Sequence, residues 1–408
     1  MHTFGRAVVA AGIAVSVAMT AACGSDSDSG APAEPVIDLA SLDVGNLPTE
    51  LKPYDKPTSI EQAKLVEAWR LGNALPLPVE IMPEVKYAPS AMGGAIRSFI
   101  DFSSTVMKSR ASAEPDAMTA AAPGFVTGFL TTGRSDSVPS LSYELDNVVM
   151  IFADEQSATN AAAALERINF EAEPGSEEVR LAKYPAALSY ATDNISGPGQ
   201  LRSWYATGKF VIFSYVYDSV MSALKERDLG KLTERAERSF ETISARLATF
   251  QPTPQDNLMD LAPDPDGMLA RALPTVADDQ SQRGVPGVYD RQGGLQVSLA
   301  PDEDTTLFQE TGVDAVAWRG NFVYRAQDAA GAAEIVTVRS ATSRKFRPVE
   351  SPANLPNALC REYYGSKYDI SFYCFVSHGR YAAEVAANQL LDAQQRISAQ
   401  YARLVNAG

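Results

Sequence analysis

Histidine is almost missing from this sequence, and its scarcity limits the chemistry that the chain can perform. Of 408 residues, two are histidine, His2 and His378. A Ser-His-Asp triad would have to use His378, and no Gly-x-Ser-x-Gly turn supplies a nucleophilic serine. A zinc site needs several His or Cys ligands, which the sequence does not offer together. We therefore expect no enzymatic activity, no metal and no cofactor.

Long apolar runs and basic charge are also in short supply. Beyond Ala22, no apolar stretch approaches the roughly 20 residues that a membrane-spanning helix needs. The formal net charge is −15 at pH 7. Such an acidic surface repels phosphate backbones, so we expect no nucleic acid partner.

Two motif matches lack the parts that their chemistry requires. Asp264–Gly267 resembles part of a calcium loop, but Ala262 and Leu273 stand where the first and last acidic ligands belong. Ser222 and Lys225 match the Ser-x-x-Lys of penicillin-binding enzymes, without the accompanying Lys-Thr-Gly. A carboxylate pair for glycan cleavage does not stand out by spacing among such candidates as Asp154, Glu155, Glu362 and Asp369.

Cysteine is scarce, with three in the chain, and the first lies near the N-terminus. Cys23 follows Arg6 and an apolar run from Ala7 to Ala22, which is the pattern of a secretory signal peptide. The small residues around Cys23 resemble a bacterial lipobox, although Thr20 stands where lipoboxes usually carry Leu. The resemblance implies removal of residues 1–22 and acylation of Cys23. The alternative is an ordinary secreted protein.

The other two cysteines, Cys360 and Cys374, predict a disulfide. Their segments read as two strands around a turn at Gly365–Lys367, which places the two cysteines directly opposite each other. Outside the cytoplasm such a pair is normally oxidised. Closing a loop of this length stabilises a protein by about 3 kcal/mol. The alternative is two buried free thiols.

Composition divides the rest of the chain into four parts. Residues 23–37 are rich in Ser, Asp, Ala and Pro and are expected to form a flexible, lipidated tether. Residues 38–251 are assigned to an N-terminal α+β domain, residues 252–268 to a linker rich in Pro and Asp, and residues 269–408 to a C-terminal α+β domain.

Hydrophobic periodicity and capping residues predict similar elements in both parts. In the first, the predicted elements are helices over 59–72 and 94–107, a strand over 148–152, a helix capped by Asp154, a hairpin over 204–217 and a long helix over 229–250. In the second, they are a strand over 321–325, a helix starting at Asp328, the cysteine hairpin and a closing helix over 379–404. Aligning the hairpin around Gly208 with that around Gly365 indicates a duplication. The predicted fold is α+β, with two related domains, each a hairpin-rich antiparallel sheet covered on one face by amphipathic helices.

Aromatic side chains on strands provide one candidate ligand groove. Strands that are apolar on both faces are normally buried in a core. A groove for a lipid or glycan is the other interpretation, because tyrosine combines an apolar body with a polar tip. The candidate groove residues are Phe213, Tyr215, Tyr217 and Phe372.

Several segments together resemble uncharacterised two-domain lipoproteins of mycobacteria, nocardiae and rhodococci, a domain-of-unknown-function family. They are the stretches 63–71, 74–78, 124–129 and 147–168. The resemblance implies an actinobacterial envelope lipoprotein on the outer face of the cell membrane. We expect a non-catalytic binding or scaffolding role, with a lipid, glycan or envelope protein as partner. The alternative is an envelope hydrolase that acts on cell-wall material through carboxylates.

Overall fold

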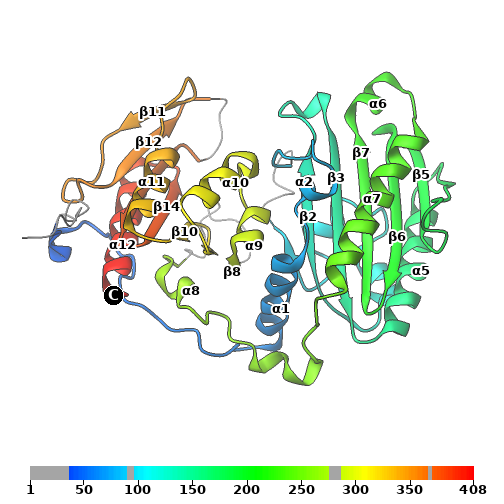
Figure 1. Ribbon diagram of the computed structural model, residues 1–408, viewed down its shortest axis with the longest axis horizontal. Helices are drawn as coiled ribbons and strands as arrows, with labels where there is room; N and C mark the ends of the chain where they lie inside the picture. The colour runs from blue at the N-terminus through cyan, green and yellow to red at the C-terminus, as the bar shows by residue number, and fades with distance from the viewer. Residues whose placement is uncertain (1–35, 90–95, 275–285, 366–369) are drawn as a thin grey trace, which may run out of the picture. The chain divides into compact units, whose positions relative to one another are not determined.

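The computed structural model describes residues 36–89, 96–274, 286–365 and 370–408. Within them the chain forms two seven-stranded sheets in which all neighbouring strands are antiparallel (Figure 1). Helices pack on both sheets. The expected α+β class with two related domains is therefore confirmed.

The first sheet has the strand order β1-β2-β3-β7-β6-β5-β4. Its strands are β1 (Ser98–Phe99), β2 (Phe125–Arg134), β3 (Tyr143–Phe152), β4 (Glu177–Glu178), β5 (Leu188–Asn194), β6 (Gly197–Thr207) and β7 (Phe210–Asp218). The helices packed on it are α1 (Ile60–Ala74), α5 (Glu155–Ala172), α6 (Ser219–Leu224) and α7 (Leu229–Leu247).

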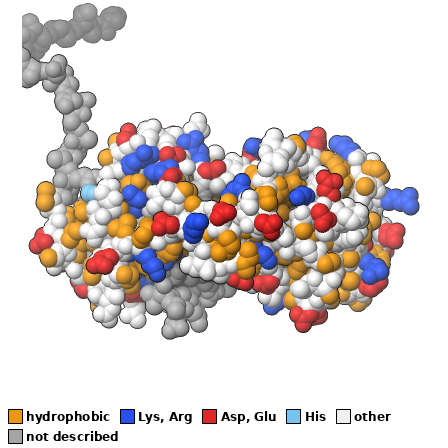
Figure 2. Space-filling view, turned by 90° about the horizontal axis from the view of Figure 1, so that it is seen from below, with side chains coloured by type: hydrophobic (Ala, Val, Ile, Leu, Met, Phe, Trp, Pro, Cys, Tyr) orange, Lys and Arg blue, Asp and Glu red, His pale blue; other side chains and the backbone are white. Residues whose placement is uncertain are grey.

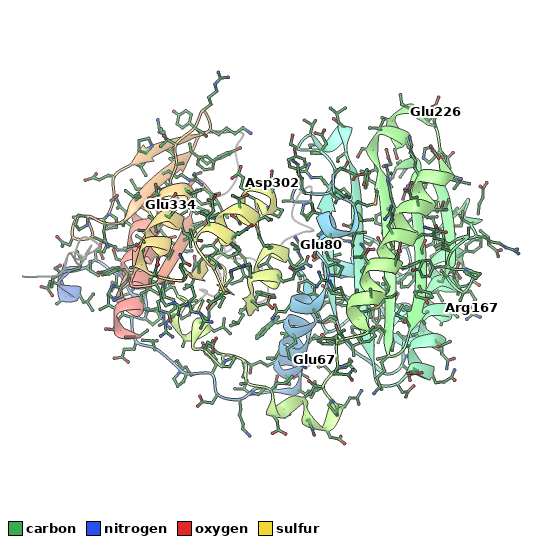
Figure 3. All side chains as sticks on the ribbon, in the orientation of Figure 1. Glu67, Glu80, Arg167, Glu226, Asp302 and Glu334 are labelled. Carbon is green, nitrogen blue, oxygen red and sulfur yellow. A yellow bond between two sulfur atoms is a disulfide. The ribbon has the colours of Figure 1, made fainter. Side chains whose placement is uncertain are left out.

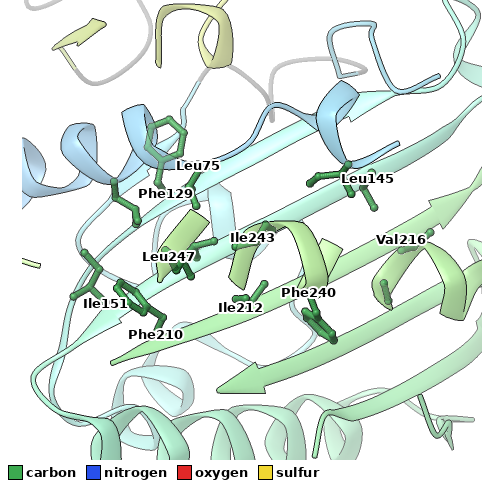
Figure 4. Close-up of a cluster of buried hydrophobic side chains, with 14 of the residues drawn as sticks. Leu75, Phe129, Leu145, Ile151, Phe210, Ile212, Val216, Phe240, Ile243 and Leu247 are labelled. Carbon is green, nitrogen blue, oxygen red and sulfur yellow. The ribbon is translucent and has the colours of Figure 1, made fainter. Parts of the chain in front are cut away.

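Helices cover both faces of this sheet, whereas the sequence predicted helices on one face only. The side chains of β3 alternate, so that Val148 and Met150 pack beneath α5 while Val149 and Ile151 pack beneath α1 and α7. Figure 4 shows the second cluster, in which Phe240 of α7 lies over the strands. Because β3 and β7 are apolar on both faces, each face needs its own helical cover.

The second sheet has the order β11-β12-β13-β14-β10-β9-β8. Its strands are β8 (Gly287–Asp290), β9 (Ala315–Trp318), β10 (Phe322–Arg325), β11 (Phe346–Val349), β12 (Leu359–Tyr363), β13 (Phe372–His378) and β14 (Tyr381–Ala387). Helix α11 (Ala329–Arg339) contributes to one hydrophobic cluster against this sheet and α12 (Leu390–Asn406) to the other. Shorter elements between and around the sheets are η1 (Leu39–Ser41), α2 (Pro78–Ile81), α3 (Thr105–Lys108), α4 (Pro115–Ala121), η3 (Pro139–Leu141), η4 (Gln255–Asp260), α8 (Met268–Arg271), α9 (Arg291–Gln296) and α10 (Pro301–Glu310).

Read from β8, the second sheet repeats the strand order of the first. In each sheet the third strand leads into a helix capped by an aspartate, Asp154 for α5 and Asp328 for α11. In each, the last two strands form a two-residue hairpin at a glycine with positive φ, Gly208 or Gly379. Topology thus matches β6–β7 with β13–β14, which corrects the predicted alignment of Gly208 with the cysteine hairpin.

The first part of the predicted closing helix over 379–404 is a strand, β14. His378 pairs with Tyr381 across the turn, and β14 continues to Ala387 before α12 begins at Leu390. The φ of +51° at Gly379 suits a tight hairpin turn, which only glycine adopts without strain. The run of alanines favoured a helix by local propensity, but pairing with β13 and β10 determined the strand.

Two further helix predictions differ from the structure. The helix expected over 94–107 is instead β1 followed by the short α3, with residues 90–95 outside the described ranges. Helix α1 starts at its predicted cap, where Ser59 accepts a hydrogen bond from the Gln62 backbone, but it continues to Ala74.

The segment 37–50 packs against the second half of the chain, although its sequence position places it with the first. Leu42 belongs to the hydrophobic cluster beneath α12. Arg403 of α12 donates hydrogen bonds to the backbone oxygens of Pro48 and Glu50. These contacts hold the segment on the C-terminal sheet, since buried Arg403 satisfies its carbonyls.

Candidate functional site

A cavity of about 200 Å³ lies between residues of the two halves. The first half contributes the segment around α2 and the end of β2, and the second contributes the region from α9 to the start of α10. Its walls are mostly apolar, formed by such side chains as Leu77, Val79, Val85 and Leu295. Asp302, labelled at the start of α10 in Figure 3, also lines it.

Local sequence explains how these walls are positioned. Pro78 begins α2, where its missing N–H costs nothing, and Glu80 accepts a hydrogen bond of 2.7 Å from the Leu77 backbone. On the opposite wall, the Gln296 side-chain amide donates to the backbone oxygens of Leu75 and Pro76, at 3.3 and 3.0 Å. The two walls are therefore joined by hydrogen bonds as well as by apolar packing.

Arg97 is the principal charged group of the cavity. It is 4% exposed, and its Nε donates to the Gln296 backbone oxygen at 2.8 Å. Its Nη1 is buried and has no hydrogen-bond partner, and no carboxylate in the described ranges forms an ion pair with it. Burial lowers the pKa of Arg97 to about 10, with Arg110 adding to the effect. Arg97 therefore forms no ion pair within the described ranges, although the nearby Asp146 favours its charged form.

Two other buried polar atoms on the cavity wall lack partners. Thr132 is 6% exposed and Gln296 is 3% exposed, and neither Thr132 Oγ1 nor Gln296 Oε1 makes a hydrogen bond. An unsatisfied buried polar group costs about 1–3 kcal/mol. Three residues that line this small, mostly apolar cavity therefore each have a buried polar atom without a partner: a cationic donor, a hydroxyl and an amide acceptor.

A buried ionic network adjoins the same wall. Ser298 lines the cavity and donates its hydroxyl to Asp304, which is 2% exposed. Asp304 pairs with Arg339 at 2.7 Å, and Arg339 also lies 3.7 Å from Glu384. Burial raises the pKa of both Asp304 and Glu384, while Arg339 acts in the opposite direction. In this network one arginine serves two carboxylates, whereas Arg97 forms no ion pair within the described ranges.

The four aromatic residues predicted to form a groove do not lie together. Phe213 is fully buried beneath α5 and stacks on Trp204, with ring centroids 3.9 Å apart. Tyr215 donates its hydroxyl to Gln200, and Phe372 belongs to the other sheet. Neither these three nor Tyr217 lines the cavity. The reason is that helices cover both faces of β7, so its aromatic residues serve the core.

The cysteines are placed as their register indicates. Cys360 and Cys374 lie opposite each other on β12 and β13 and form a disulfide with a Cα–Cα distance of 4.2 Å. Cys23 lies outside the described residues, as does Asp369.

The remaining motif residues have structural roles. Asp264 accepts hydrogen bonds from the backbones of Leu269 and Ala270, at 2.9 and 2.8 Å. Lys225 is the left-handed C-cap residue of α6. Asp154 caps α5, and Glu362 pairs with Arg347, so these two carboxylates form no catalytic pair.

Sequence reasoning missed Arg97, Thr132 and Gln296. Arg97 and Gln296 lie 199 positions apart, so no local spacing links them. The one available signal was an arginine beside the apolar residues Ile96 and Phe99, which is unusual for a buried segment.

Comparison with protein families identifies both halves of the chain. Residues 54–263 match the N-terminal domain of DUF7373, a domain of unknown function, and residues 268–407 match its C-terminal domain. The chain belongs to the DUF7373 family. No curated protein and no solved structure matches this DUF7373 chain.

Two other kinds of site do not occur among the described residues. None of their helices has the length and apolar character to cross a membrane. Nor do they contain a group of three or more His, Cys, Asp or Glu side chains placed to hold a metal ion. On the face shown in Figure 2, acidic, basic and apolar side chains are interspersed.

Proposed function

We propose that this DUF7373 protein is a non-enzymatic binding protein that holds a small ligand in the cavity between its two halves. The observation that carries the proposal is that three residues lining one mostly apolar cavity, Arg97, Thr132 and Gln296, each have a buried polar atom without a hydrogen-bond partner. Small-molecule sites combine apolar walls with a few polar groups in this way. A bound ligand would satisfy groups that the empty protein leaves unsatisfied.

The cavity also limits the size of the ligand. Its volume of about 200 Å³ lies below the roughly 300–1,000 Å³ of drug-sized sites. It suits a small molecule, or one end group of a lipid or glycan, rather than a whole wall polymer.

The proposed location is the outer face of the cell membrane of an actinobacterium, with acyl chains on Cys23 as the anchor. This part of the proposal is supported by the apolar run before Cys23 and by the lipobox-like residues around it. Two or more acyl chains would hold the protein stably. We expect Cys23→Ser to move the protein from the membrane fraction to the soluble fraction, as measured by fractionation and immunoblotting. Continued membrane association of this variant would contradict the proposed anchor.

Ligand binding is tested by native mass spectrometry of the Cys23→Ser protein purified from an actinobacterial host. The expected result is a stoichiometric small molecule that is lost when Leu77→Trp fills the cavity. A matched control is Leu141→Trp, since Leu141 is 62% exposed and lies outside the cavity. A ligand retained by Leu77→Trp would place its binding site elsewhere.

A further inference from the structure

The charge of the cavity restricts the chemistry of its ligand. Arg97 carries one positive charge at a position that is 4% exposed. The Asp146 carboxylate favours that charge from a distance but forms its ion pair with Arg110, and no described residue forms an ion pair with Arg97 itself. A buried unpaired cation is costly, and a ligand anion would supply the missing counter-ion. The described residues that line the cavity include the basic Arg97 and Lys86 and the acidic Asp302, so the lining has a net charge of +1, which a monoanion neutralises. A phosphate dianion would leave one negative charge uncompensated in the same apolar surroundings.

The second requirement is a hydrogen-bond donor on the ligand. Gln296 Oε1 is an acceptor without a partner, and the amide nitrogen of the same side chain is already bound to Leu75 and Pro76. The orientation of the amide is fixed by those two carbonyls, so the oxygen is the atom left for the ligand. Thr132 Oγ1 can donate to the ligand anion.

The third requirement is that anion and donor lie close together on the ligand. Arg97 Nε is bound to the Gln296 backbone oxygen at 2.8 Å, so the guanidinium and residue Gln296 are in direct contact. Leu77, Val79 and Val85 form an apolar part of the wall, while Lys86 and Asp302 are charged residues elsewhere in the lining. The apolar part matches a short hydrocarbon portion rather than a second polar group.

We propose that the cavity binds a small monocarboxylate with a hydroxyl group near the carboxylate and a short apolar chain. This inference rests on the proposed function and specifies its ligand class. The carboxylate accepts from Arg97 Nη1 and Thr132, the hydroxyl donates to Gln296 Oε1, and the chain packs against Leu77 and Val85.

The test uses isothermal titration calorimetry on the purified full-length Cys23→Ser protein with four probes of matched chain length. They are 2-hydroxyhexanoate, hexanoate, 1,2-hexanediol and hexyl phosphate. We expect 2-hydroxyhexanoate to bind best, hexanoate about 2- to 10-fold more weakly, and the uncharged diol about 10- to 100-fold more weakly, from the usual strengths of neutral and charged hydrogen bonds.

Variants assign each difference to its side chain. Gln296→Leu should remove the advantage of 2-hydroxyhexanoate over hexanoate, and Arg97→Met should remove the advantage of hexanoate over an uncharged probe. Arg97→Met should also leave urea resistance unchanged or raised, because it removes an unpaired buried charge. The matched control is Arg110→Met, which should lower urea resistance because Arg110 is equally buried but pairs with Asp146 at 2.7 Å.

The outcomes separate this inference from the proposed function. Tighter binding of hexyl phosphate, or an advantage of carboxylates that survives Arg97→Met, would overturn the ligand class while a binding cavity remained. Failure of all four probes would also overturn the ligand class. The proposed function would fall only if Leu77→Trp also failed to affect any co-purified molecule.

Discussion

The two halves of this chain share one strand order but differ in the side chains packed beneath one helix. That helix follows the third strand and is α5 in the first half and α11 in the second. Beneath α5 the first half packs Leu165 among apolar and aromatic side chains. Arg339 occupies the same position of α11, counted from the capping aspartate (154 to 165 and 328 to 339). On the last strand of each sheet, Phe213 in the first half corresponds to Glu384 in the second, counted from the hairpin glycine.

This difference shows that the topology does not require one kind of core. Phe213 stacks on Trp204, whereas Glu384 lies opposite Phe375 and approaches Arg339. The second filling works because Arg339 is close to both buried carboxylates, Asp304 and Glu384, as burial of charge demands. The comparison predicts that substitutions at corresponding positions change the stability of the two halves by different amounts.

The largest expected effect comes from breaking the ionic network of the second half. Arg339→Met leaves Asp304 and Glu384 buried without their cation, and we expect a loss of about 3–5 kcal/mol in the stability of this sheet. Amide hydrogen exchange on β14 measures it separately from the first sheet. The control Arg347→Met, whose side chain is 54% exposed, breaks a surface pair worth about 0–1 kcal/mol. Equal effects of the two variants would refute the importance of the network.

The next largest expected effect is the stabilisation of the first sheet by an added disulfide. Ser189 and Ser203 are buried opposite each other on β5 and β6, at positions that correspond to Cys360 and Cys374 on β12 and β13. We expect the double variant Ser189→Cys/Ser203→Cys to form a second disulfide and to raise the stability of the first sheet by up to about 3 kcal/mol. Intact mass before and after reduction, with hydrogen exchange on β6, checks this.

Removal of the existing bridge gives the reciprocal measurement. Replacing Cys360 and Cys374 by serine should lower the stability of the second sheet by about 3 kcal/mol. Free thiols in the Ser189→Cys/Ser203→Cys protein after oxidation would show that the two hairpins are not geometrically equivalent.

Removing the capping aspartate should lower helix stability by a smaller amount, equal in the two halves. Asp154 accepts from the Ser157 backbone at 2.7 Å and Asp328 from the Gly331 backbone at 2.8 Å. Asp154→Ala and Asp328→Ala should each cost about 1 kcal/mol in the exchange protection of their own helix. Glu155→Ala, at an exposed position that follows the cap, is the control. Unequal losses would indicate that the two helices depend on their caps to different extents.

The smallest effect is a change in the pH dependence of stability. Burial raises the pKa of Glu384 above its ordinary value of 4.5. Between the ordinary and the raised pKa the folded state binds more protons than the unfolded state, so stability falls as pH rises through this window. Glu384→Gln should flatten that fall in urea titrations performed from pH 4 upward. A profile unchanged from the parent would mean that Glu384 does not titrate there.

Local sequence predicted those parts of the fold that depend on neighbours along the chain. Asp154 was identified as a cap, the helix start at Asp328 was located, and the hairpin at Gly208 was placed correctly, because a helix start or a two-residue turn involves few adjacent residues. The pairing of Cys360 with Cys374 followed from strand register in the same way. The predicted helix over 379–404 failed because its alanines favour helix locally while β10 and β13 hold them in a strand.

What the sequence by itself determined is the α+β class, the twofold repetition of elements, the caps and the disulfide, since each follows from periodicity or spacing within a short segment. The strand order and the cavity were decided only by the tertiary structure. Arg97 meets Gln296 across 199 positions, and the burial that lowers the pKa of Arg97 is a property of the surrounding packing. Burial and charge pairing are set by residues distant in sequence, so these features exist only once both halves have folded.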